Sequence, residues 1–192
     1  MKEISNRALA LLVAMAVIVS LIGTLTILAK IKPVMTGAAT GIAKVDVTGL
    51  VAISLPTSTV DFGTVYQGGT DNTSDDSPGP LTVQNDGGVF VNVSIKRDVS
   101  STPLFSGTGG GDNTASFQFK VDNSTEVNSF DYAASITSWT NVPGTTAVDN
   151  IIAYLNSSDA SDIAEVDLLI AVPNDESTGP KNETLVFTAI QS

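Results

Sequence analysis

The sequence contains no histidine and no cysteine among its 192 residues. The chain therefore lacks the commonest general base, a thiol nucleophile, disulfide bonds and the usual ligands of zinc sites. A serine nucleophile would have only lysine as its base, and none of the four lysines after residue 32 shows the sequence signature of an apolar pocket. We therefore expect a protein that is not an enzyme, with no catalytic and no cofactor-binding residues.

Basic residues are scarce beyond the N-terminal segment. The formal net charge is −11. Residues 1–32 carry a net charge of +3, which leaves −14 for residues 33–192. An acidic body of this kind repels phosphate backbones, so we expect no nucleic-acid partner.

An uncharged run of 22 residues lies between Arg7 and Lys30. As a helix it would extend about 33 Å, enough to cross the hydrocarbon core of a bilayer. We predict a short cytoplasmic head at residues 1–7, a transmembrane or filament-core helix at 8–32, and a linker at 33–43 that begins with Pro33. The alternative is a cleaved secretory signal, with small residues at Gly37–Ala39 as its cleavage site, but such signals have apolar regions of only about 7–15 residues.

The residues that open this run carry a family resemblance. Arg7-Ala8-Leu9-Ala10 resembles the class III leader of archaeal type IV pilins and archaellins. The resemblance implies cleavage between Ala8 and Leu9, after which the helix stays on the mature subunit and packs in a filament core. Small residues four positions apart, such as Ala10 and Ala14, permit close helix packing and self-association. They are equally compatible with a plain membrane anchor.

From residue 44 onward the sequence has the pattern of a β domain. Apolar residues alternate with polar ones in short runs, and segments rich in Gly, Asn, Asp and Ser separate these runs. Alternation of this kind predicts half-buried strands, and many short strands predict a single antiparallel β-sandwich over residues 44–192. We expect Phe117, Phe119, Val166, Leu168 and Ile170 to be buried. The predicted strands cover residues 44–54, 58–66, 80–84, 89–97, 116–122, 133–141, 150–155, 165–172 and 184–191.

Two phrases resemble immunoglobulin-like domains of bacteria and archaea. "STVDFGTVYQGG" followed by "PLTVQNDGGVFVNVSI" is similar to the opening half of such domains, and "VPNDESTGPKNETLVFTA" to the closing half. The whole layout resembles small archaeal surface proteins. Unlike antibody domains, the chain has no disulfide, so we expect Trp139 to be a core or edge aromatic.

Asn-x-Ser/Thr sequons are frequent in this Ser- and Thr-rich chain. Each is a candidate for N-glycosylation if its asparagine is exposed. The alternative is that Ser- and Thr-rich β proteins form such triplets by chance. The asparagines are Asn72, which we place in a loop, Asn123, Asn156 and Asn182 at predicted strand ends, and Asn92 on the polar face of a strand.

Two acidic clusters are weak candidates for Ca²⁺, which binds six to eight oxygen ligands. The first contains Asp71, Asp75 and Asp76. The second contains Asp159, Asp162, Glu165 and Asp167, of which Asp159 and Asp162 are the candidate ligands. Neither fits the EF-hand register, so solvated acidic loops are the preferred interpretation. The glycine-rich "SGTGGGDN" lacks the lysine of a phosphate-binding loop, and we interpret it as a hairpin loop.

These features together predict a membrane-anchored or pilin-like cell-envelope protein with an extracellular β-sandwich. The expected partner is the membrane, together with further copies of the chain if the helix polymerises. The alternative functions are an exported adhesin or ligand-binding module and, with less support, an exported hydrolase.

Overall fold

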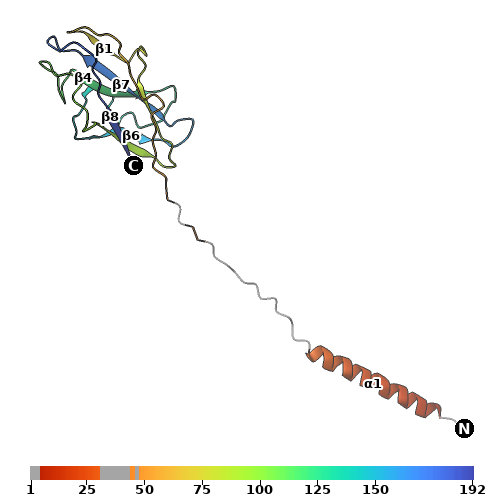
Figure 1. Ribbon diagram of the computed structural model, residues 1–192. Coiled ribbons are helices and arrows are strands. Elements are labelled where there is room, and N and C mark those ends of the chain that lie inside the picture. Colours follow the sequence, from red (N-terminus) through yellow and green to blue (C-terminus); the bar gives the residue numbers. More distant parts are fainter. Residues whose placement is uncertain (1–4, 31–43, 46–47) are drawn as a thin grey trace. The chain divides into compact units, whose positions relative to one another are not determined.

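The computed structural model describes residues 5–30, 44–45 and 48–192, which form an N-terminal helix and a separate β-rich unit (Figure 1). Helix α1 extends from Asn6 to Lys30 without a break. The predicted helix at 8–32 is therefore confirmed up to residue 30, and it begins two residues earlier than expected. Residues 31–32 and the predicted linker at 33–43 lie outside the described residues.

The β-rich unit contains two antiparallel sheets, which confirms the predicted sandwich architecture. In the larger sheet β7 is central and pairs with β1, β2 and β4, and β4 also pairs with β5. In the smaller sheet β3 lies between β6 and β8. The strands are β1 (Thr70–Asn72), β2 (Leu81–Gln84), β3 (Val91–Arg97), β4 (Phe117–Asn123), β5 (Thr140–Asn141), β6 (Val148–Leu155), β7 (Ile163–Ala171) and β8 (Leu185–Gln191).

The hydrophobic core consists of the inward-facing residues of both sheets. In β3 and β4 every second residue is buried, because successive side chains of a strand point to opposite faces. Phe119 and Val166 are fully buried, and Phe117, Leu168 and Ile170 are at most 8% exposed, so all five predicted core residues are confirmed.

Three predicted strands differ from the structure. Among the described residues of the range 44–54, only Ser54 is bridged, to Gln84. The range 58–66 contains no strand, because Gly63 has a positive φ of 61° and its amide donates to the Asp61 side chain. The range 133–141 is reduced to β5, because the amides of Ala133 and Ala134 donate to the Asp131 carboxylate and form a turn.

Strand β6 pairs irregularly with β3. The register shifts twice, between Val91 and Val93 and between Val93 and Ile95. The two β6 residues with positive φ, Asn150 and Tyr154, lie within these shifts. They are β-bulge residues, which bend a strand and interrupt its ladder.

Candidate functional site

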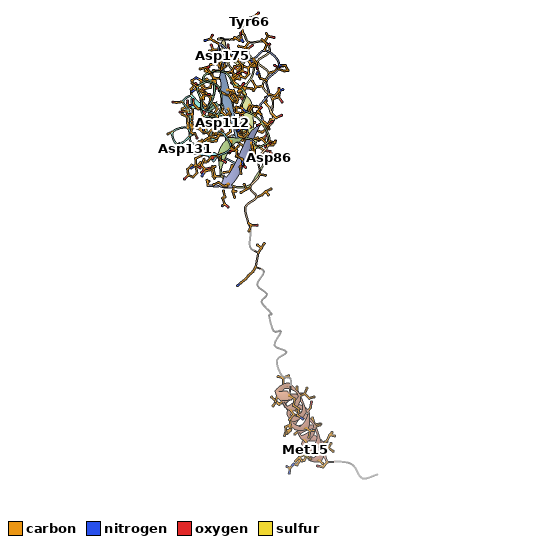
Figure 2. The ribbon with its side chains drawn as sticks, turned by 60° about the vertical axis from the view of Figure 1, so that its left-hand side comes forward. Met15, Tyr66, Asp86, Asp112, Asp131 and Asp175 are labelled. Atoms are coloured by element: carbon orange, nitrogen blue, oxygen red, sulfur yellow. The ribbon has the colours of Figure 1, made fainter. Side chains whose placement is uncertain are left out.

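Helix α1 is apolar on every side. Consecutive residues such as Leu11, Leu12 and Val13 are all more than half exposed, and no residue of the helix is buried. Figure 2 shows its side chains, Met15 among them, projecting outward from the helix. The hydroxyls of Thr24 and Thr26 donate to the backbone oxygens of Ser20 and Ile22, so these polar groups are satisfied within the helix. In the described part of the chain α1 alone is long and apolar enough to cross a membrane.

The predicted leader site lies in the first turn of α1. The amides of Ala8 and Leu9 both donate to the carbonyl of Ser5, at 2.7 and 3.0 Å. The Ala8–Leu9 bond is therefore helical in the structure, and its cleavage remains a prediction.

The five sequon asparagines differ in exposure. Asn123 and Asn182 are exposed, whereas Asn72, Asn92 and Asn156 are half-buried. Asn72 belongs to strand β1 rather than to the loop that we predicted, because residues 70–72 pair with the end of β7.

The acidic calcium candidates do not converge. Among the residues that the structure describes, no group of three metal-ligating side chains could hold an ion. In the first cluster the Asp71 carboxylate accepts a hydrogen bond from the amide of Asn72, and the Asp75 carboxylate accepts one from Ser77. Asp76 is exposed and has a positive φ. In the second cluster Asp159 is exposed and Asp162 is buried.

Asp162 is a buried carboxylate with an unpaired oxygen. The residue is 2% exposed, and its Oδ1 has no hydrogen-bond partner among the described residues. Burial raises the pKa of Asp162, a hydrogen bond from Gln84 Nε2 to Oδ2 lowers it in part, and the carboxylates of Glu126, Asp159 and Asp86 raise it further. Glu126 Oε2 accepts hydrogen bonds from the amides of Asp162 and Ile163, at 2.7 and 3.0 Å. The start of β7 thus places a buried acid in a negative field.

The glycine-rich loop binds two of the protein's own carboxylates. Glu176 Oε2 accepts hydrogen bonds from the amides of Ser106 and Gly107, at 2.6 and 2.7 Å, and Asp175 accepts one from the amide of Thr108. The ammonium group of Lys181 also donates to Glu176. Lys181 first, and then the Gly107 amide, lower the pKa of Glu176 to about 2. The predicted loop is therefore an internal clamp that joins residues about 70 positions apart in the chain.

A cleft of about 1010 Å³ opens beside β8. Its walls are the segment 58–67, the loop 176–184 and core residues of both sheets, with Phe117, Ile170 and Phe187 among them. β8 pairs with β3 over seven residues, but no backbone hydrogen bond between described residues joins its other edge to the segment 58–67. β8 contains no charge and no proline, which are the usual means of protecting an edge strand.

A lysine that the sequence did not single out pairs across the larger sheet. Lys120 and Asp167 are opposite each other on β4 and β7, with 3.1 Å between Nζ and Oδ2. The Lys120 ammonium also lies 5.3 Å from the ring centre of Trp139, next to edge strand β5. Trp139 is half-buried, so it is an edge aromatic. Strand alternation indicates that Lys120 faces outward, but only the pairing of the two strands identifies its partner.

No family model matches the chain, and no curated protein is significantly similar to it.

Proposed function

We propose that this chain is a non-enzymatic cell-envelope protein that retains helix α1 and displays an immunoglobulin-like sandwich outside the membrane. The observation that supports this proposal is the uniformly apolar surface of α1. A helix that packed on a domain, or lay on a membrane surface, would have one polar face. This helix has none, so it requires apolar surroundings on all sides.

The energy of burial favours this proposal strongly. Thirteen large apolar residues of α1, from Leu9 to Leu28, are more than half exposed. At about 1.5–3 kcal/mol for each fully buried side chain, transfer of the helix from water releases roughly 20–40 kcal/mol. A bilayer provides such surroundings, and so does the core of a filament built from many copies of the helix.

The mass of the protein from its native cells distinguishes the possible fates of the helix. A mature chain that begins at Leu9 supports the pilin-like route, in which α1 is a filament core. An intact chain supports a plain membrane anchor. A chain that begins near Thr40 has lost α1 as a secretory signal and contradicts the proposal.

The cleft beside β8 favours a second candidate function, an exported ligand-binding or adhesive module. Its volume lies at the upper end of the range for small-molecule sites, and apolar residues such as Leu104, Phe105 and Phe187 line it. Native mass spectrometry of the purified protein tests this candidate. A bound molecule that is displaced when Leu104→Trp narrows the cleft supports it, and a ligand-free protein contradicts it.

A further inference from the structure

Two of the five sequon asparagines have structural roles. Asn92 Oδ1 accepts a hydrogen bond from the amide of Tyr154, a bulge residue of β6, at 2.9 Å. Asn92 lies in β3, the central strand of its sheet, and the next residue, Val93, is fully buried. Asn156 Nδ2, the nitrogen that would receive a sugar, donates to Ser161 Oγ at 2.9 Å. Neither site can enter a transferase without disruption of the surrounding fold.

Asn72 is restricted in a similar way. Its strand pairs with β7, and its side-chain oxygen accepts a hydrogen bond from the amide of Ser74. The middle residue of the sequon, Thr73, is fully buried and donates to the Asp167 carboxylate at 2.6 Å. The middle residue of the Asn182 sequon, Glu183, also accepts a hydrogen bond, from the amide of Leu104, so the distinction between the sites depends on the exposure and hydrogen bonds of the asparagines themselves.

Asn123 and Asn182 differ from the other three. Both asparagines are exposed, and so are the third residues of their sequons, Thr125 and Thr184. Asn123 is the last residue of β4, and Asn182 precedes β8 by three positions. They lie at opposite ends of the sandwich, because Asn123 is opposite Ala164 near the start of β7, whereas Asn182 lines the same cleft as Ile170 near the end of β7.

We infer that Asn123 and Asn182 carry N-linked glycans and that Asn72, Asn92 and Asn156 do not. In the reaction Nδ2 of the asparagine attacks C1 of a sugar that is linked through phosphate to a lipid. The C1–N bond forms, the C1–O bond to phosphate breaks, the lipid phosphate leaves, and Nδ2 loses one proton. The inference depends on the proposed location of the sandwich outside the membrane, where such a transferase would act on the folded domain.

The test is peptide and intact mass spectrometry of the full chain purified from its native cells. We expect glycopeptides that contain Asn123 and Asn182, and unmodified peptides that contain the other three sites. Thr125→Val and Thr184→Val keep the acceptor asparagines but should each remove one glycan mass. Ser158→Ala is the matched control, since it destroys the Asn156 sequon at an exposed position and should remove no glycan.

A glycan on Asn72, Asn92 or Asn156, or an unmodified Asn123 or Asn182 in exported protein, would overturn the inference. Protease treatment of intact cells distinguishes this failure from failure of the proposed function. If the sandwich is digested but carries no sugar, only the glycan inference is wrong. If the sandwich is protected, it is not exported and both proposals are wrong.

Discussion

The buried carboxylate of Asp162 provides a sharp test of the structure. We predict that Asp162→Asn stabilises the sandwich at pH 7, because the substitution keeps the shape of the side chain and removes its charge. The wild-type residue is 2% exposed, has an unpaired Oδ1 and is repelled by Glu126, Asp159 and Asp86. Asparagine still leaves one polar atom unpaired at this position, so the gain comes from removal of the buried charge. We expect the free energy of unfolding to rise by about 1–3 kcal/mol.

The effect depends on pH in a defined direction. The pKa of Asp162 is raised in the folded state, so the folded protein binds this proton more tightly than the unfolded chain does. The stabilising contribution of the proton is complete below the ordinary aspartate pKa of 3.8, and it is lost as the pH rises through the folded pKa. The advantage of Asp162→Asn should therefore be largest at neutral pH and should vanish near pH 4.

Thermal unfolding can be followed through the fluorescence of Trp139, the only tryptophan of the chain, which belongs to the sandwich and not to α1. At about 3 °C per kcal/mol for a domain of this size, Tm should rise by about 3–9 °C. The exposed Asp149→Asn is the control, with little expected change, because Asp149 is not one of the carboxylates that raise the pKa of Asp162. An unchanged or lower Tm at pH 7 would refute the reasoning. If Ca²⁺ raises the wild-type Tm and Asp162→Asn abolishes this effect, Asp162 binds a cation instead.

Three further predictions concern the helix, the core and the clamp. If α1 forms a filament core, Ala14→Phe should abolish filaments in electron micrographs while Leu12→Phe preserves them, and filaments in both variants would contradict close helix packing. Phe119→Ala should lower the free energy of unfolding, measured by chemical denaturation, by about 3–5 kcal/mol, because Phe119 is fully buried. Tyr66 is 81% exposed, so Tyr66→Ala should change this free energy by less than about 0.5 kcal/mol. Glu176 has a folded pKa of about 2 against an ordinary 4.5, so it stabilises the fold above pH 4.5 and this contribution is lost as the pH falls towards 2. The Tm of Glu176→Gln should lack this contribution to the pH dependence. If Tm falls with acid equally in the variant and the wild type, the clamp is not formed.

The sequence pattern predicts an element correctly where the residues of that element alone determine its structure. The uncharged run predicted α1, because backbone hydrogen bonds in a helix are satisfied within the segment and only the apolar length matters. Alternation predicted β3, β4 and β7 to within two residues at each end, because their inner faces are apolar and their outer faces are polar. It overpredicted residues 58–66, where the turn at Gly63 interrupts the strand.

The triplet pattern identified the five sequons but not their exposure. Asn92 and Asn123 both belong to strands. Asn92 accepts a hydrogen bond from a bulge residue of β6, whereas Asn123 is exposed at the end of β4. Only the tertiary structure distinguishes the exposed asparagine from the half-buried one, because exposure depends on which strands pack beside the strand that contains it.

The amino-acid order is enough to predict a long apolar helix, a sandwich whose strands alternate apolar and polar residues, and an acidic body without histidine or cysteine chemistry. Only the tertiary structure determined the partners of the charged residues. Lys120 contacts Asp167, and the glycine-rich loop binds Glu176, although many residues separate the partners along the chain. The physical reason is that helix length and strand alternation are local properties, whereas burial and hydrogen bonding of a carboxylate depend on distant segments brought together by folding.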